Sequence, residues 1–437
     1  MLGTWRESDS WNAAFSLSGL TMKLSRTFSC CFAVASLAGM AAEPPEPKFR
    51  AVTIDDQIQI GYGLAVADVD GDGKPDVLLA DKKQFVWYRN PGADKAGESS
   101  AWKKYLIAEN LTEKDNVCLA AQDIDGDGKC EVAVGAEWNP ADTEKSGAVF
   151  YLIAPADRTQ KWEAVKFPSV EPTTHRMKWL KLDDGTWGLL VVPLHGRGNK
   201  NAEGAPVKVL LYRKPADPHR EWKSEVIDES MHAAHNFHIA SQTAALPQGI
   251  GLIIGGKEGL RGASAGPNAG QWSARNLLPA DGGREATAGV GEVRTGGLPG
   301  KAGLIATVEP MHGNMLAVYT NSARDIGNAS SERKRHVLTD QLTEGHALAC
   351  GDVLKAGYDQ VIVGWRGNPQ KVHPVGIKLF TPLDQQGEKW RESFIDDDGM
   401  GCEDLVLADL NGDEKLDVVA SGRSTRNVKV YLNETVN

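Results

Sequence analysis

Short apolar runs recur along the chain from residue 47 onward, and each is bounded by glycine, proline or acidic residues. The first four runs read YGLAVAD, PDVLLA, FVWYRNP and WKKYLIAEN, and the same four-part order returns as far as the C-terminus. Runs of this length that are rich in β-branched and aromatic residues, with turn formers between them, are typical of strands. The pattern therefore predicts an all-β protein built from repeated four-stranded units.

Seven such units follow one another between residues 47 and 437. The fourth has a poorly marked third strand, and the last ends at VKVYLNE with no fourth strand. The segment KFRAVTIDD, residues 48–56, resembles the fourth strand WRESFIDDD of the preceding unit. The N-terminal segment can therefore supply the strand that the last unit lacks.

A single four-stranded sheet cannot bury both of its faces, whereas radial stacking of sheets buries them and closure of the ring removes exposed edges. We therefore predict a seven-bladed β-propeller over residues 47–437, closed by an N-terminal strand that completes the last blade. Two β-sandwiches are the alternative, which the common register of the seven units disfavours.

Residues 1–46 do not follow the strand pattern. From Met22 the chain reads MKLSRTFSCCFAVASLAGMAAEPPEP, with a basic start, a short apolar stretch, small residues and a Pro/Glu-rich spacer. This order predicts a secretory signal peptide that begins at Met22 and is cleaved near Ala41 or Ala42. The apolar stretch is too short to span a bilayer. We expect a secreted or periplasmic protein with no membrane span.

Composition narrows the choice of partners. With 41% hydrophobic and 24% charged residues the chain is an ordinary globular protein, and its 47 glycines suit a turn-rich β fold. The net charge of -10 argues against nucleic acid as a partner. The oligomeric state stays open.

Three acidic loops of the form D-x-D-x-D-G-x-x-D, or close variants of it, lie between the first and second strands of a unit. Carboxylates this close repel one another without a cation, and hard oxygen ligands at this spacing suit Ca²⁺. A strand follows each loop, so none belongs to an EF-hand, and we expect structural calcium that braces a hairpin. The predicted ligands are Asp68, Asp70, Asp72, Asp76 and the carbonyl of Lys74 in the first loop; Asp123, Asp125, Asp127 and Glu131 in the second; and Asp409, Asn411, Asp413 and Asp417 in the third.

These strands and loops resemble the FG-GAP and VCBS repeats of integrin-like propellers, over essentially all of residues 47–437. The resemblance implies the propeller fold. It leaves the function open, because the same repeats serve adhesion, binding and catalysis.

A second pattern lies six residues before the first acidic position of each loop, or before its counterpart in units without a loop. The residues there are Tyr62, Val117, His175, His235, Ala286, His346 and Glu403. Imidazoles and a carboxylate that converge on a channel can bind a transition metal. We predict His175, His235, His346 and Glu403 as ligands of Zn²⁺ or another divalent transition metal such as Mn²⁺. Acid–base chemistry without a metal, or histidines that merely pack in the core, are the alternatives.

The loops that follow the second strands share a face with these histidines, and the acidic loops lie on the other face. This histidine-bearing face carries His195, His232, Glu258, His312, Arg366, His373 and Arg423. We predict His195, His312 or Tyr62 as a general base. We expect Arg366, Arg423 and Glu258 to bind an anionic or polyhydroxyl substrate.

Several segments have a narrower resemblance: HNFHIA, TVEPMHGNMLAVYT, EGHALACGD, IVGWRG and GMGCEDLVLADLNGDEKLDVVASGRSTRNVKVYLNE look like the propeller domain of aldos-2-ulose dehydratases. The resemblance implies elimination of water from keto sugars, with a metal in the propeller. Fungal members carry cupin domains after the propeller, whereas this sequence ends at Asn437, so we expect the propeller activity alone.

The sequence therefore predicts a secreted metal-dependent lyase that acts on keto sugars or oxidised glycosides. The alternative is a non-catalytic, calcium-stabilised propeller that binds a glycan or a protein. A repeat protein with a purely structural role is a third possibility, which the histidine pattern disfavours.

Overall fold

The computed structural model describes residues 43–182, 184–240, 251–266, 270–279, 289–320, 333–368 and 370–436. Residues 43–437 cluster as one compact unit. The predicted signal peptide and its cleavage site lie outside the described residues. In the described ranges the regular structure is strand, apart from two 3-10 turns, η1 (Ser99–Ala101) and η2 (Pro299–Lys301). Within the described residues, no helix is long and apolar enough to cross a membrane.

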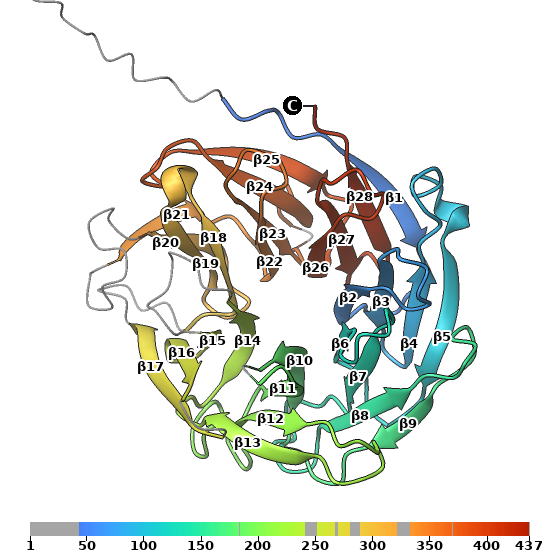
Figure 1. The fold of residues 1–437 in the computed structure, drawn as a ribbon. Coiled ribbons are helices and arrows are strands. Elements are labelled where there is room, and N and C mark those ends of the chain that lie inside the picture. Colours follow the sequence, from blue (N-terminus) through green and yellow to red (C-terminus); the bar gives the residue numbers. More distant parts are fainter. Residues whose placement is uncertain are drawn as a thin grey trace, which may run out of the picture. The chain divides into compact units, whose positions relative to one another are not determined.

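The described part of the chain forms seven four-stranded antiparallel sheets, the blades of a propeller (Figure 1). Blade 1 consists of β2 (Gly63–Ala67), β3 (Asp76–Ala80), β4 (Gln84–Arg89) and β5 (Lys103–Glu109); blade 2 of β6 (Cys118–Gln122), β7 (Glu131–Ala136), β8 (Ala148–Ile153) and β9 (Glu163–Lys166); blade 3 of β10 (Thr174–Lys181), β11 (Trp187–Pro193), β12 (Val209–Arg213) and β13 (Lys223–Asp228); and blade 4 of β14 (Ala234–Ile239), β15 (Leu252–Gly256), β16 (Gly259–Ala265) and β17 (Trp272–Pro279).

The remaining blades follow the same order from the inner to the outer strand. Blade 5 consists of β18 (Glu292–Gly297), β19 (Gly303–Glu309), β20 (Met315–Thr320) and β21 (Lys334–Thr339); blade 6 of β22 (Gly345–Gly351), β23 (Gln360–Trp365), β24 (Gly376–Pro382) and β25 (Trp390–Asp397); and blade 7 of β26 (Cys402–Ala408), β27 (Asp417–Gly422), β28 (Val428–Asn433) and β1 (Phe49–Asp55).

Blade 7 closes the ring in the predicted way. β1 pairs antiparallel with β28, with Phe49 opposite Asn433 and Asp55 opposite Val428. Each inner strand contacts the inner strand of the next blade, and β26 of the last blade contacts β2 of the first. Both the seven-bladed fold and its closure by the N-terminal strand are thus confirmed.

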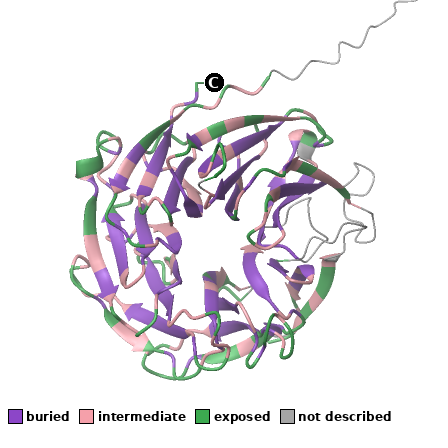
Figure 2. Ribbon diagram, turned by 180° about the vertical axis from the view of Figure 1, so that it is seen from behind, coloured by how far each residue is buried: buried purple, intermediate pink, exposed green. Residues whose placement is uncertain are grey.

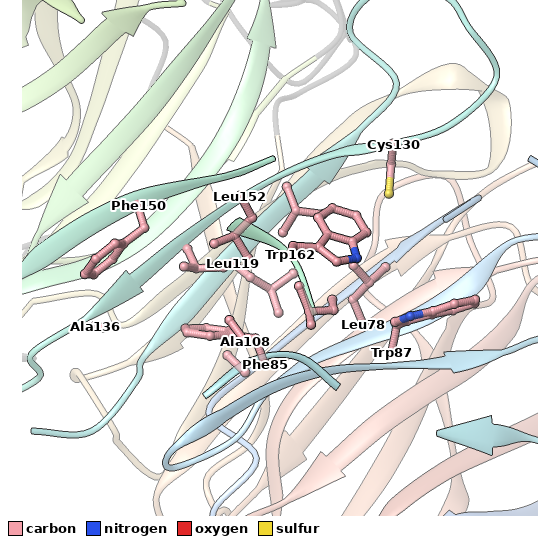
Figure 3. Packing of buried hydrophobic residues seen from close by; sticks show 14 of the residues in the cluster. Leu78, Phe85, Trp87, Ala108, Leu119, Cys130, Ala136, Phe150, Leu152 and Trp162 are labelled. Atoms are coloured by element: carbon pink, nitrogen blue, oxygen red, sulfur yellow. The ribbon is translucent and has the colours of Figure 1, made fainter. Parts of the chain in front are cut away.

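The core lies between neighbouring blades. Every residue of the second strand of blade 1, β3, is buried, whereas the outer strand β5 begins with two exposed residues (Figure 2). Between blades 1 and 2, Leu78 and Trp87 lie on one side and Phe150 and Leu152 on the other (Figure 3). Truncating one of these to alanine typically costs about 2–5 kcal/mol.

Blade 4 contains the strand that the sequence marks poorly. β16 reads GLRGASA and pairs with β17 along its whole length and with β15 from Gly259 to Ala263. Its glycines and short side chains give no strand signal, yet the neighbouring strands hold it in the sheet. The chain turns into β16 at Lys257 and Glu258, so the predicted loop after β15 is a tight hairpin.

Candidate functional site

Four inner strands begin with a β-bulge at the same register position. The pairing register shifts across His175 in β10, His235 in β14, His346 in β22 and Glu403 in β26. A bulge adds one residue to a strand and re-aims its side chain. The three histidines and the glutamate that share one register position in the sequence therefore also share a backbone feature, the bulge at the start of each strand.

Hydrogen bonds between blades connect these positions. Nδ1 of His175 donates to the carbonyl of His235 at 2.7 Å, that of His235 to the carbonyl of Gly291 at 2.8 Å, and that of His346 to the carbonyl of Glu403 at 2.6 Å. Because a carbonyl only accepts, each bond places the proton on Nδ1 and leaves the lone pair on Nε2.

The same bonds show which residue of blade 5 is equivalent to these histidines. It is Gly291, whose carbonyl accepts from His235. The sequence spacing assigns Ala286 to this position, and Ala286 lies outside the described residues. The assignment is five residues out because the turn between β18 and β19, which reads LPGKA, offers no acidic residue from which to count.

Three imidazoles meet at the mouth of the channel. The ligand nitrogens of His235, His312 and His346 all lie within 4.8 Å of one another. His235 is central: Nε2 lies 2.6 Å from Nε2 of His312, and its ring centroid is 5.2 Å from that of His346. His312 comes from the loop after β19, where its backbone has a φ of 53°. We call these three residues the imidazole cluster.

The surroundings keep members of the cluster unprotonated. Burial, His235 and Arg366 lower the pKa of His312 to about 2. Burial and Arg366 hold the pKa of His346 well below its usual range. Metal binding requires neutral imidazoles, so these residues need no proton release to act as ligands.

The cluster fits a tetrahedral ion with one adjustment. Nitrogen ligands about 2.0–2.1 Å from zinc lie roughly 3.3 Å apart. The 2.6 Å contact between His235 and His312 is instead that of a hydrogen-bonded pair. His312, an exposed residue on a loop, would have to lie farther from His235 for both rings to bind one ion.

His175 lies beside the cluster rather than in it. Its ring centroid is 4.8 Å from that of His235, but Nη1 of Arg176 lies 3.1 Å from its Nε2. An arginine only donates hydrogen bonds, so it occupies the lone pair that a metal would need. The ring also stacks on Trp138, with centroids 5.0 Å apart. The structure thus groups His312, and not His175, with His235 and His346.

Glu403 is clamped between two arginines. Its Oε2 accepts from Nη1 of Arg366 and its Oε1 from Nη1 of Arg423, both at 3.3 Å. Its Oε1 is 4.0 Å from Nε2 of His346. Arg423 also lies over the ring of Tyr62, 5.5 Å from its centroid. The predicted ligand and the two predicted substrate-binding arginines therefore form one network on the rim.

Tyr62 is a buried phenol at this rim. Its hydroxyl donates to Oδ2 of Asp115 at 3.3 Å. Burial is the main cause that raises the pKa of Tyr62 to about 12, although Arg423 opposes the rise. Tyr62 therefore stays protonated at neutral pH, which suits a hydrogen-bond donor better than a base.

His195 lines a cavity of about 650 Å³ between the loops that follow β7 and β11. The cavity also takes in Pro140, Ala141, Asp142, Thr143, Glu144, Asn199, Lys200 and Asn201. The backbone of His195 is fixed to Oγ1 of Thr173, two residues before His175, and forms a bridge with Ala233. Burial lowers the pKa of His195. His195 is therefore a neutral imidazole in the wall of this cavity, with its backbone held by a residue two positions before His175.

Other predicted residues of this face lie further out. Glu258 pairs with Nδ1 of His232 at 2.7 Å and accepts from its backbone N–H at 3.0 Å. His373 pairs with Asp397 at 2.7 Å and packs on Phe394 of the outer strand β25. His373 is therefore part of the outer edge of blade 6.

A layer of polar residues that was not predicted from the sequence lies one position further along the inner strands: Arg176, Asn236, Glu292 and Asp404. Oε1 of Glu292 lies 3.2 Å from Nδ1 of His235, and Oε2 accepts from Nδ2 of Asn236 at 2.6 Å. Burial opposes ionisation, but His235 and Arg294 outweigh it and hold the pKa of Glu292 below its usual value. The sequence does contain a signal for this layer: charged residues directly follow three of the register positions.

Deeper in the channel the charges change sign. Burial and Arg294 lower the pKa of Lys178 to about 8. Burial, Arg294 and Lys178 lower the pKa of His238 to about 3, and Nε2 of His238 lies 3.0 Å from Oγ1 of Thr295. Lys178 and His238 therefore lie close to Arg294 and disfavour a further positive charge at this level of the inner strands.

The acidic loops lie at the other ends of the inner strands, and all three have the same internal hydrogen bonds. The first carboxylate accepts from the N–H groups three and five residues later: Asp68 from Gly71 and Gly73, Asp123 from Gly126 and Gly128, and Asp409 from Gly412 and Glu414. The ninth residue accepts from the second: Asp76 from Val69, Glu131 from Ile124, and Asp417 from Leu410.

Carboxylate oxygens converge in two of these loops. Those of Asp68, Asp70 and Asp76, and those of Asp123, Asp125 and Asp127, lie within 4.8 Å of one another. Burial is the main cause that raises the pKa of Asp76 to about 7, and that of Asp417 in the third loop to about 6. These loops offer only oxygen ligands, and a cation beside them would favour the ionised form of their buried carboxylates. Such sites are suited to Ca²⁺.

Comparison with known proteins agrees with the predicted resemblance. The family described as FG-GAP-like repeat matches residues 68–134, and the family described as aldos-2-ulose dehydratase, beta-propeller domain, matches residues 146–322. The second segment contains His175, His235, Glu292 and His312. The resemblance to FG-GAP repeats and to the dehydratase propeller is therefore confirmed.

One curated relative is aldos-2-ulose dehydratase of Phanerodontia chrysosporium, 24% identical over 360 residues. The match covers 77% of this chain and 37% of the relative, so the chain spans just over a third of that enzyme. Similar solved structures include a protein of unknown function from Dyadobacter fermentans (10% identity, 90% of this chain and 100% of that chain, TM-score 0.42). Another is the PQQ domain of pyranose dehydrogenase from Coprinopsis cinerea in its holo form (10% identity, 89% and 97%, TM-score 0.44).

Proposed function

We propose that this chain is a lyase that eliminates water or an alcohol from keto sugars or oxidised glycosides, using a divalent transition metal at the imidazole cluster. The observation that carries the proposal is the meeting of His235, His312 and His346 from three blades, with their ligand nitrogens within 4.8 Å. The likeness to a propeller of aldos-2-ulose dehydratase supports the choice of substrate class.

His235, His312 and His346 would hold the ion, because three imidazoles leave an open position for a substrate. When bound, Zn²⁺ or a similar ion supplies Lewis-acid polarisation of a ketone, which acidifies the adjacent C–H. Glu403, a predicted ligand, serves instead to hold Arg366 and Arg423 at the rim. These two guanidinium groups would bind the hydroxyl groups of the sugar.

We assign the base to His195. Its lowered pKa keeps the imidazole neutral and able to take the proton from the carbon next to the ketone. The C–H electron pair becomes the new C=C bond while the neighbouring C–O bond breaks. The leaving oxygen takes up a proton and departs as water or an alcohol, with no net oxidation. Tyr62, which stays protonated, would donate a hydrogen bond to the sugar rather than act as a base.

Two further expectations belong to the proposal. The acidic loops hold structural Ca²⁺, since their oxygens match the ligands that this ion prefers. The protein is exported after cleavage near Ala41 or Ala42, and the mass of the mature N-terminus tests this directly.

Elemental analysis combined with an activity assay tests the function. We expect about one transition-metal ion per chain, lost after EDTA treatment together with turnover of an aldos-2-ulose, and restored by Zn²⁺ or Mn²⁺. His346→Ala should lose both metal and turnover while keeping its calcium. A protein that contains calcium alone and turns over no keto sugar would be a binding propeller, and the lyase proposal would be wrong.

A further inference from the structure

Glu292 is a buried carboxylate that faces the central histidine of the cluster. It is the first residue of β18 and only 1% exposed. Its Oε2 accepts from Nδ2 of Asn236 at 2.6 Å and lies 3.7 Å from Nη1 of Arg294. Its Oε1 makes no hydrogen bond and lies 3.2 Å from Nδ1 of His235.

This arrangement is costly unless a positive charge completes it. A buried carboxylate oxygen without a hydrogen bond typically costs about 1–3 kcal/mol or more. Arg294 offsets the charge only in part, because its Nη1 also donates to the carbonyl of Val293 at 2.7 Å. The imidazole of His235 is the group in front of the free oxygen. A cation on the far nitrogen of that ring would offset the remaining charge.

The other cluster histidine of an inner strand has no such partner. Nδ1 of His346 donates to the carbonyl of Glu403, whose carboxylate accepts from Arg366 and Arg423 and comes no closer to this ring than 4.0 Å, at Nε2. His235 differs because it touches the rings of His175, His312 and His346. His235, which contacts both other members of the cluster, is therefore the histidine with a carboxylate, that of Glu292, next to its Nδ1.

We infer that Glu292 is a positioning residue: with the carbonyl of Gly291 it holds the proton of His235 on Nδ1 and directs Nε2 toward the bound ion. The inference rests on the proposed metal site. Carboxylates behind ligating histidines fix the tautomer and raise the basicity of the ligand, and their loss commonly weakens metal binding about 10- to 100-fold. Glu292 does not touch the sugar in this scheme.

The decisive variant is Glu292→Gln, which keeps the shape of the side chain and removes its charge. We expect its affinity for Zn²⁺, measured by competition with a chelating indicator, to fall about 10- to 100-fold. In the metal-free protein, ¹⁵N spectra of labelled histidine, assigned with His235→Gln, should show that the Nδ1–H tautomer of His235 loses population. Should Glu292→Gln fail to fold, Glu292→Asp keeps the charge but retracts it by one methylene, and the same two losses are expected.

Asp396→Asn is the matched control. Asp396 is a buried carboxylate of blade 6, 8% exposed, that bonds Lys429 and Tyr431. Its loss should lower stability without changing Zn²⁺ affinity or the tautomer of His235. Unchanged affinity and tautomer in Glu292→Gln would overturn the inference and leave the lyase proposal standing. The tautomer of His235 is measured without metal, so this measurement tests the role of Glu292 independently of metal binding. A wild-type protein that binds no transition ion would overturn the lyase proposal and not this inference.

Discussion

The two ends of strand β26 carry different kinds of site. Glu403 lies near its start, in the network at the channel mouth, and Asp409 follows its end, in an acidic loop. Six residues, roughly 20 Å of strand, separate them. Asp409 bonds to Gly412 and Glu414 within its own loop, whereas Nδ1 and Nε2 of His235 at the mouth meet partners 56 and 77 residues away.

This difference determines what each site can do. An acidic loop is complete within nine residues, so each blade can gain or lose one without affecting the others, and three of the blades carry one. The imidazole cluster exists only when blades 4, 5 and 6 are assembled, because each supplies a single ring. Under the proposed function, the local sites would stabilise hairpins, while the composite site, which needs three assembled blades, would carry the chemistry.

The largest effect should come from removing one ring of the composite site. His312→Ala should abolish transition-metal binding and reduce turnover of an aldos-2-ulose at least ~10³-fold, since loss of the ion removes more than the 10²–10³-fold that one hydrogen-bond donor supplies. His175→Gln is the paired control, because Arg176 already occupies its Nε2. Metal analysis of both variants separates them. Loss of the ion in His175→Gln with retention in His312→Ala would restore the ligand set predicted from sequence.

A smaller effect is expected at His195, the proposed base in the wall of the cavity. His195→Gln should lower kcat roughly 10²-fold or more, the usual contribution of a general base, and leave metal content unchanged. Steady-state kinetics on a keto sugar with parallel metal analysis checks this. If kcat is unaffected, the base lies elsewhere on the rim.

The sequence predicts the acidic loops and the propeller well for one physical reason. A loop that closes on itself, as Asp68 does with Gly71 and Gly73, is readable from spacing alone. The repeat then gives the blades, and the shared register brings out His235 and His346. Pairing of β1 with β28 followed from the same repeat, since the last unit lacked one strand.

Which histidines form the imidazole cluster could not be predicted from spacing and repeats. His312 joins through the conformation of a loop, and Arg176 excludes His175 through a contact between adjacent side chains. Glu292 matters because of a histidine 57 residues earlier in the chain. β16 escapes detection because its glycines carry no pattern, although its neighbours fix it. Each of these depends on three-dimensional neighbours rather than on spacing.

The opposite face should respond in stability rather than in activity. Asp123→Asn keeps the shape of the second loop but removes one charge from its oxygen cluster. We expect its thermal midpoint in saturating Ca²⁺ to fall by roughly 5 °C, because a calcium site filled 100-fold above its Kd contributes about 2.7 kcal/mol. Transition-metal content should not change. Calcium titration into metal-stripped wild-type protein that leaves the midpoint unmoved would refute a structural role for the ion.

The smallest effect concerns the channel that joins the two faces. Lys178 has a folded pKa of about 8, below its unfolded value of 10.5, because of burial and Arg294. The folded protein therefore binds fewer protons between these values, so stability should rise as pH increases from 8 to 10.5 and be lost as pH falls through 8. Lys178→Met should remove this slope and stabilise the protein at pH 7 by on the order of 1 kcal/mol, a value reduced for the access of Lys178 to water. Urea unfolding of Lys178→Met across this pH range tests the prediction. Lys181→Met in the same strand is the control: the ammonium of Lys181 lies over the ring of Trp187, and its removal should leave the slope unchanged. If the slope persists in Lys178→Met, another group causes it, and the charge of Lys178 does not destabilise the fold.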